Sequence, residues 1–80
     1  MFNAHIVTIS DKILYNGKAH SVMMPGVEGE FEVVDLHGPI AALLAPGVIT
    51  IVTGKKEPWQ EVIEQGVVRF DGKELFAVVE

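Results

Sequence analysis

The sequence predicts an all-β fold, a small sandwich or flattened barrel of about ten short, mostly antiparallel strands. Apolar and polar residues alternate with a period of two, as in half-buried strands, and several runs are rich in β-branched residues. Turn signals separate these runs at intervals of about 8–12 residues, which is typical of sandwiches and barrels. A chain of 80 residues is enough for one domain, so we expect residues 1–80 to form a single unit.

The first half of the chain contains three segments with a strand or hairpin signal. Residues 2–10 are rich in β-branched side chains and predict a strand. Asn16-Gly17 lies between two apolar runs, which is the strongest short-range signal for a hairpin turn. Residues 30–34, EFEVV, alternate in polarity, so a strand there would have two different faces. One face would carry Glu30, Glu32 and Val34, and the other Phe31 and Val33.

The second half contains the only candidate for a helix. Residues 39–46, PIAALLAP, are apolar, but they are too few for a stable helix and are bounded by prolines, so we expect one helical turn or an irregular crossover. Residues 47–53 form another β-branched run, and residues 58–66 alternate again, with Trp59 expected in the core or covering an edge. Asp71-Gly72 lies between two apolar arms and predicts a second hairpin.

Composition argues against several classes of partner. The formal net charge is −5 and the pI is about 5.0. Nucleic-acid binding requires clustered Lys and Arg, and anionic lipid repels an acidic surface, so we expect neither partner. The sequence has no cysteine, no basic n-region like that of a signal peptide, and no apolar run approaching about 18 residues. These features predict a cytosolic or organellar protein that does not itself span a membrane.

Catalytic, cofactor and metal sites are not indicated. His20 precedes Ser21, but neighbouring residues of a strand point to opposite faces and cannot form a nucleophile–base pair. Residues 26–29, GVEG, lack the Lys-Ser/Thr pair and the strand-to-helix transition of a phosphate-binding loop. The three histidines match no standard metal spacing, and the acids form no calcium-loop pattern. We therefore expect a non-catalytic protein without a metal or cofactor.

The acids in residues 24–39 have no basic neighbour in the sequence, since no Lys or Arg occurs between Lys18 and Lys55. They are either ordinary solvated turn residues, or their neutralising charge lies on another molecule. His37, before Gly-Pro, also has two interpretations: a partly buried side chain bonded to a backbone carbonyl, or a contact residue at an interface. The acids are Glu28, Glu30, Glu32 and Asp35.

Several motifs stand at fixed spacing in the middle of the chain: Pro25-Gly26, Gly29, His37-x-Pro39 and Leu44-x-Pro46-Gly47. In this order they resemble the N-terminal β-sandwich domain of the epsilon subunit of the F-type ATP synthase, which is called delta in mitochondria. The resemblance covers roughly residues 5–52 well and the rest of the chain more loosely.

The resemblance implies a non-catalytic subunit of the central rotor stalk, which links the gamma subunit to the c ring and so couples ion translocation to ATP synthesis. It implies a peripheral position on the cytoplasmic face of the bacterial inner membrane, or the organelle equivalent, with membrane association only through the complex. The implied gamma contacts are His37 and Pro39. The implied c-ring contacts, whose acids would be neutralised by basic ring loops, are Glu28, Gly29, Glu30 and Phe31.

This sequence departs from the family pattern at several points. Glu32 stands where Gly is usual, Asp35-Leu36 where a Pro-Gly pair is usual, Gly38 where Ala is common, and residues 65–67, QGV, where the family has GGF. The family also continues into a two-helix C-terminal hairpin, which is absent from this sequence, so the chain is either a naturally short subunit or an excised domain. We therefore expect the family's inhibitory function to be missing here, together with any ATP site in those helices.

A function of a different class stays open from the sequence. A free-standing β-sandwich module could bind a small ligand or a carbohydrate through an exposed sheet face. Such a module would carry solvent-facing aromatic side chains along one sheet, whereas this sequence has few aromatic residues and they do not cluster. Co-purification with a gamma subunit would separate this alternative from the stalk function.

Overall fold

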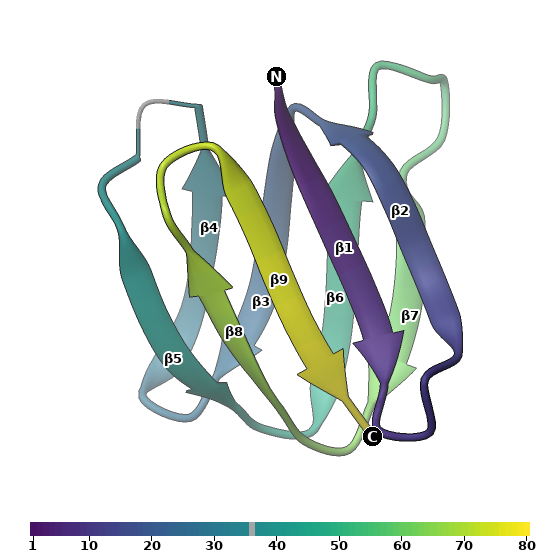
Figure 1. The fold of residues 1–80 in the computed structure, drawn as a ribbon, viewed down its shortest axis with the longest axis vertical. Helices are drawn as coiled ribbons and strands as arrows, with labels where there is room; N and C mark the ends of the chain where they lie inside the picture. The colour runs from purple at the N-terminus through teal and green to yellow at the C-terminus, as the bar shows by residue number, and fades with distance from the viewer. Residues whose placement is uncertain (36) are drawn as a thin grey trace.

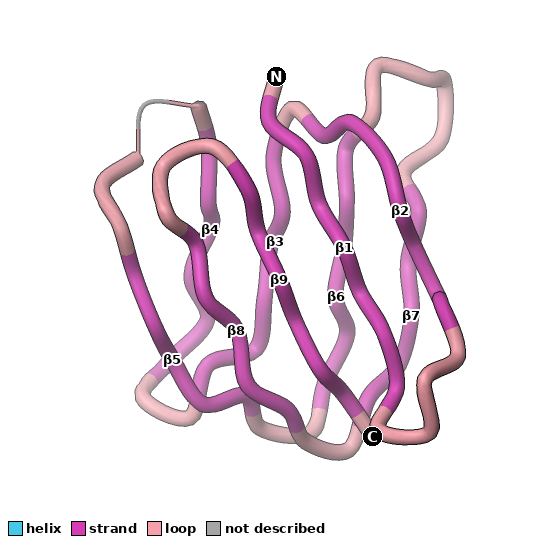
Figure 2. Tube along the Cα trace, viewed as in Figure 1, coloured by secondary structure: helices cyan, strands magenta, loops and turns pink. Residues whose placement is uncertain are grey.

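The computed structural model describes residues 1–35 and 37–80. Leu36, the second residue of the Asp35-Leu36 departure from the family pattern, lies outside the described residues. Within these ranges every regular element is a strand, which confirms the all-β prediction with nine strands against the expected ten or so (Figure 2). The strands are β1 (Phe2–Thr8), β2 (Ile13–Ala19), β3 (Ser21–Gly26), β4 (Gly29–Val34), β5 (Ile40–Leu44), β6 (Gly47–Val52), β7 (Trp59–Ile63), β8 (Gly66–Phe70) and β9 (Glu74–Val79).

The strands form two layers that face each other (Figure 1). The front layer has the order β5-β8-β9-β1-β2, and the back layer has the order β4-β3-β6-β7. One residue pair, Gly26 with Leu44, joins the layers through β3 and β5, so the sheet curls round at this edge. All the pairings are antiparallel except that between β1 and β9, the first and last strands, which lie side by side in Figure 1.

The core fills the space between the two layers. The alternation predicted for residues 30–34 is confirmed, since Val33 is fully buried and Val34 is exposed. The Phe2 and Phe70 rings pack in a T-shaped arrangement, with the ring centroids 5.2 Å apart. Close packing of this kind makes the sandwich a stiff body. The largest fully buried side chains are Phe70, Ile6, Met24, Ile49, Ile51, Leu75, Val22, Val33 and Val79.

The hairpin predicted at Asn16-Gly17 is wrong. Both residues lie within β2, where Asn16 pairs with His5 and Gly17 pairs with Ala4 on β1. Pairing along almost the whole of β1 overrides the local turn preference. The turn falls instead between β1 and β2, where Asp11 has a φ of 68° and the backbone N–H of Lys12 donates to the Thr8 hydroxyl oxygen at 3.0 Å.

The helical turn or crossover expected at residues 39–46 is also wrong. Residues Ile40–Leu44 form β5, which pairs with β8 from Ile40 opposite Phe70 to Leu44 opposite Gly66. A short apolar run does not distinguish a helix from a buried strand, and here the pairing with β8 decides. The flanking prolines stand at the ends of the strand, where no ladder hydrogen bond is lost.

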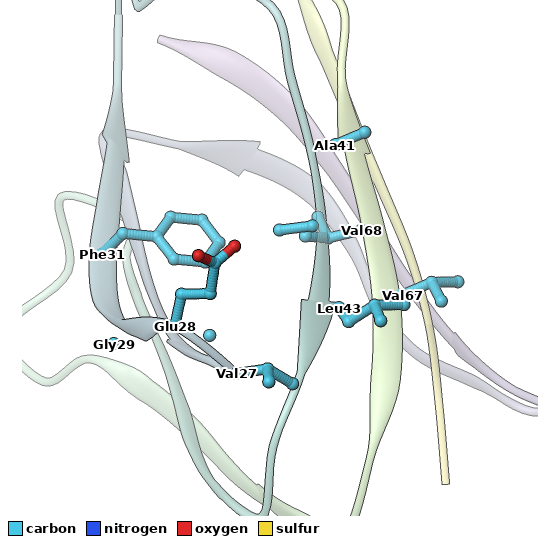
Figure 3. A pocket seen from close by; sticks show the side chains of 10 residues that line it. Val27, Glu28, Gly29, Phe31, Ala41, Leu43, Val67 and Val68 are labelled. Atoms are coloured by element: carbon cyan, nitrogen blue, oxygen red, sulfur yellow. The ribbon is translucent and has the colours of Figure 1, made fainter.

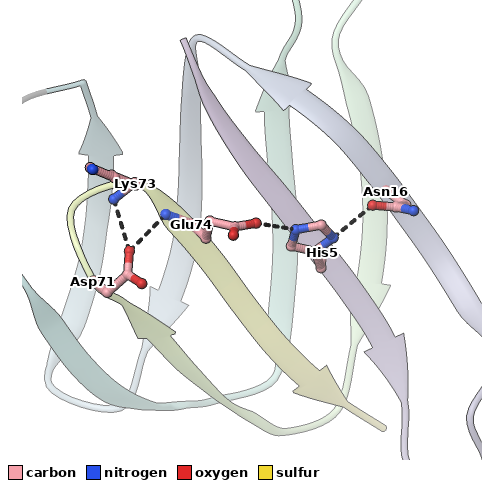
Figure 4. A network of polar contacts seen from close by, with 5 residues as sticks. All are labelled: His5, Asn16, Asp71, Lys73 and Glu74. Atoms are coloured by element: carbon pink, nitrogen blue, oxygen red, sulfur yellow. Dashed lines mark hydrogen bonds and ion pairs between the residues drawn. The ribbon is translucent and has the colours of Figure 1, made fainter.

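The second predicted hairpin is confirmed at Asp71-Gly72, between β8 and β9. Gly72 has a φ of 102°, which an L-residue rarely adopts. The Asp71 carboxylate accepts hydrogen bonds from the backbone N–H groups of Glu74 at 2.8 Å and Lys73 at 2.9 Å (Figure 4). These two bonds, the one from Glu74 first, hold the pKa of Asp71 below its ordinary value.

His5 ties together the three strands at the centre and edge of the front layer. Its Nδ1 lies 2.6 Å from Oδ1 of Asn16 on β2, and its Nε2 lies 2.9 Å from Oε1 of Glu74 on β9 (Figure 4). The imidazole also stacks on the Phe76 ring, with centroids 4.6 Å apart. These contacts lie on the outer face of the layer.

Trp59 covers an edge of the core, as expected from the sequence. It is partly buried at the start of β7 and packs against Tyr15 of β2, with ring centroids 5.3 Å apart. The Tyr15 hydroxyl donates to the backbone carbonyl of Lys18 at 2.5 Å, and burial raises the pKa of this phenol. The pair therefore closes the sandwich between the edge strands β2 and β7.

Candidate interaction surface

The GVEG segment forms a tight turn between β3 and β4. Gly26 and Gly29 are paired across the hairpin, so Val27 and Glu28 alone make the bend. Gly29 has a φ of 129°, a conformation that favours glycine. A Cβ on Gly26 would lie 2.6 Å from the Gly29 carbonyl oxygen and 2.9 Å from the Phe31 ring. The two glycines are therefore required by the turn itself.

The turn is held against the neighbouring strands. The backbone N–H of Val27 donates to the carbonyl of Leu43 at 3.0 Å, and that of Ala45 donates to the carbonyl of Pro25 at 2.7 Å. A Cβ on Gly47 would meet Pro25 at 2.6 Å, so the start of β6 must also be glycine. Pro25, Gly26, Gly29 and Gly47 thus meet at one end of the sandwich and make the turn a firmly anchored projection.

The four residues expected to contact the c ring do not share one face. Glu28 is exposed at the tip of the turn, and Glu30 is exposed on the outer face of β4. The Phe31 ring is partly buried, packs against the core and lies with Glu28 along a surface hollow (Figure 3). A partner that contacts all of them would have to wrap around the hairpin.

Ion pairing within the chain differs among the acids of this region. The Asp35 carboxylate lies 2.5 Å from the amino group of Met1. Among the described residues, by contrast, no ion pair involves Glu28, Glu30 or Glu32. Three of the four acids in this segment therefore project into solvent without a basic partner from this part of the chain.

His37 lies in the segment between β4 and β5, and its local contacts match the simpler interpretation of the sequence. Its Nδ1 is 2.7 Å from the carbonyl oxygen of Gly38, and the ring packs edge-on near Phe70, with centroids 6.3 Å apart. The side chain is half-buried, whereas Pro39 is exposed. Part of the imidazole and the neighbouring proline thus remain accessible to a partner.

The two expected contact regions lie at opposite ends of β4. Glu28 precedes the strand and His37 follows it, so the six residues of β4 lie between these two side chains. At about 3.3 Å per residue, this is a distance of roughly 20 Å. The longest extent of the whole molecule is 26 Å, so the structure does not bring the two regions together.

The exposed apolar residues next to the turn were not predicted from the sequence. Val27 is 60% exposed and Leu43 is 63% exposed. Both line a hollow of about 510 Å³ that Val67 of β8 also borders (Figure 3). The signal was present in the apolar run of residues 39–46, because a strand there must expose alternate residues.

Other kinds of site are not assembled in the described parts of the chain. No three His, Asp or Glu side chains in residues 1–35 and 37–80 gather closely enough to hold a metal ion. The same residues include no helix that is long and apolar enough to cross a membrane. Phe76 stands alone among the aromatic residues as strongly exposed there, so no aromatic stripe crosses a sheet face.

The fold and surface define a small β-sandwich domain whose distinctive features are its anchored, charged turns. Comparison with known protein families identifies the family to which this domain belongs. Residues 1–80 match the family described as ATP synthase, Delta/Epsilon chain, beta-sandwich domain, and the chain belongs to this family. The family resemblance seen in the sequence is therefore confirmed.

Curated relatives of this chain are ATP synthase epsilon chains. It is 43% identical over 68 residues to the epsilon chain of Sulfurimonas denitrificans, covering 85% of this chain and 52% of that one. It is 34% identical over 56 residues to the epsilon chain of Rhodopseudomonas palustris, covering 70% and 40% respectively. The matched region is thus about half of these relatives or less.

Two solved structures share the fold. A chain of the Euglena gracilis mitochondrial ATP synthase, in a structure of OSCP, F1 and the c-ring, aligns with a TM-score of 0.88 at 18% identity, over 98% of this chain and 49% of its own. A chain from the central stalk and c-ring structure of the Tetrahymena thermophila enzyme aligns with a TM-score of 0.79 at 14% identity, over 98% and 62%. At these identities the similarity establishes the fold alone.

Proposed function

We propose that residues 1–80 act as one unit, a non-catalytic subunit of the central stalk of an F-type ATP synthase. In this role the sandwich links the gamma subunit to the c ring, so that the two rotate together. The observation that carries the proposal is the family match over the whole chain. The unpaired acids Glu28 and Glu30 on an anchored turn support it, since a basic partner surface would complement them.

The proposed mechanism is mechanical rather than chemical. A stiff body with partners at both ends of β4 would carry torque from one to the other with little internal movement. The c-ring side would be the turn with Glu28, Gly29, Glu30 and Phe31, and the gamma side would be His37 and Pro39. The domain would meet the membrane only through the complex, on the cytoplasmic face of a bacterial inner membrane or the organelle equivalent.

The direct test is co-expression of this chain with the gamma subunit and c ring from the same genome. The expected result is stoichiometric co-purification with gamma and retention on detergent-solubilised rings. A control is the chain with Glu57→Lys, which reverses one acidic charge in the loop between β6 and β7, outside the expected contact residues, and should associate as wild type does. If well-folded chain fails to associate with either subunit, the stalk function is wrong.

A further inference from the structure

A second hollow adjoins the one beside the β3–β4 turn. It has a volume of about 380 Å³ and lies along the start of β8 and the end of β9. Three residues border both hollows, namely Val27, Leu43 and Val67. The two hollows therefore adjoin at these residues, and together they are called the trough here. In Figure 3, Glu28 and Phe31 lie on one side of the first hollow, and β5 and β8, which carry Leu43 and Val67, lie on the other.

The trough is lined mostly by apolar residues and has one acidic side chain in each of its two hollows. The only charged side chains among the described residues that border it are Glu28 in the first hollow and Glu80 in the second. The Glu80 carboxylate accepts a hydrogen bond from the Gln65 amide at 2.9 Å, which leaves its charge uncompensated. No described Lys or Arg lines either hollow, so the surface combines exposed apolar groups with negative potential.

The apolar lining and the two acids favour some classes of ligand over others. An anionic lipid surface would be repelled by the two acids, and a small polar ligand would find few hydrogen-bonding side chains in the lining. A polypeptide segment with apolar side chains flanked by Lys or Arg satisfies both features at once. Apolar anchors would cover Leu43 and Val67, and the basic residues would reach Glu28 and Glu80.

We infer that the trough binds an apolar polypeptide segment with basic flanks, contributed by a protein partner in the stalk. The inference rests on the proposed function only in placing that partner in the stalk. The trough, its exposed apolar residues and its charge do not depend on that assignment. Because Glu28 belongs to both the trough and the β3–β4 turn, a partner seated here would lie directly beside whatever contacts the turn.

The first test uses the isolated 80-residue chain, labelled with nitrogen-15, and a short designed peptide with a leucine pair at its centre and lysines at each end. The expected result is amide shift changes confined to the trough, around Val27, Leu43, Val67 and Val78, weakening as salt is raised. A counterpart peptide with glutamates in place of lysines should bind at least about tenfold more weakly. Equal binding of the two peptides, or shifts on another face, would overturn the inference.

The second test uses charge-matched variants. Glu28→Lys combined with Glu80→Lys should weaken binding of the lysine peptide by at least about tenfold. Glu32→Lys combined with Glu57→Lys makes the same change in net charge away from the trough and should leave binding within about twofold. Leu43→Thr should weaken binding without unfolding the domain, since Leu43 is 63% exposed. An equal loss in both charge variants would reduce the effect to net charge and contradict a specific site.

A third measurement separates this inference from the proposed function. Co-purification with the gamma subunit and c ring is assayed for wild type and for Leu43→Thr. Association that survives intact in the variant, together with no peptide binding by the wild type, would overturn the trough and leave the stalk function standing. Peptide binding without any association with either subunit would overturn the stalk function and leave the trough as a docking site for another protein.

Discussion

Gly26 and Gly29 face each other across the β3–β4 turn so closely that a Cβ on Gly26 would lie 2.6 Å from the Gly29 carbonyl oxygen. The obstacle is backbone, which cannot move aside without opening the turn. Because Glu28 stands between these glycines, their packing also fixes the position of its charge. The backbone of the turn therefore determines where the Glu28 carboxylate lies on the surface of the sandwich.

Gly26→Ala should destabilise the domain by about 1–3 kcal/mol, the usual cost of overpacking. Gly38→Ala is the matched control, because a Cβ there meets nothing within 4 Å. Urea unfolding followed by circular dichroism compares the two variants with wild type. An unchanged free energy of unfolding for Gly26→Ala would mean that the turn is looser than its packing indicates.

Gly17→Ala tests the corrected position of the first turn. Gly17 lies within β2, its φ is not positive, and a Cβ would make an ordinary 3.6 Å contact with the Tyr15 hydroxyl. Alanine in a strand interior costs less chain entropy than glycine, so the variant should be more stable by about 0.5–1 kcal/mol. Thermal unfolding measures this change. A clear loss of stability would instead favour a tight turn at Asn16-Gly17.

Glu30→Lys should separate association from folding. Exposed charges contribute about 0–1 kcal/mol to stability, so the melting temperature should change by less than about 8 °C. Across the proposed ring contact, the reversed charge should lower the proton pumping achieved per ATP hydrolysed by the reconstituted enzyme. A large fall in melting temperature with normal pumping would show that Glu30 serves folding and that its neutralising partner lies within this chain.

The Asp71 turn should contribute stability that depends on pH. Because hydrogen bonds from the Glu74 and Lys73 backbone hold the folded-state pKa of Asp71 below its ordinary value, the ionised form is favoured by folding. Its contribution is present above the unfolded pKa and is lost as pH falls through the folded pKa. The stability gap between wild type and Asp71→Ala should thus be largest near neutral pH and narrow below about pH 4. A gap that stays constant in urea unfolding down to about pH 2 would contradict this.

Phe70→Ala should destabilise the domain by about 3–5 kcal/mol, because the ring is fully buried and packs against Phe2. Phe76→Ala, on the outer face of β9 where the ring is about half exposed, should cost much less. Chemical denaturation of both variants gives the comparison. Similar losses at the two positions would mean that the outer face of the front layer is covered in solution.

The sequence by itself determined the all-β class, the two-faced strands and the hairpin at Asp71-Gly72. Each depends on local chemistry: alternation with a period of two separates Val33 from Val34, and glycine is needed where φ is positive. The motifs Pro25-Gly26 and Leu44-x-Pro46-Gly47 also contributed to identifying the family, and Gly26 and Gly47 both stand where a Cβ would clash near the β3–β4 turn.

Only the tertiary structure decided where the other strands run and what they expose. Asn16-Gly17 has a strong turn preference, but pairing with β1 along the strand outweighs it. Residues 39–46 are apolar enough for either helix or strand, and pairing with β8 selects the strand. The trough depends on Val27, Leu43 and Val67, which belong to a turn and two strands. Their proximity is created by folding, and no local pattern in the sequence records it.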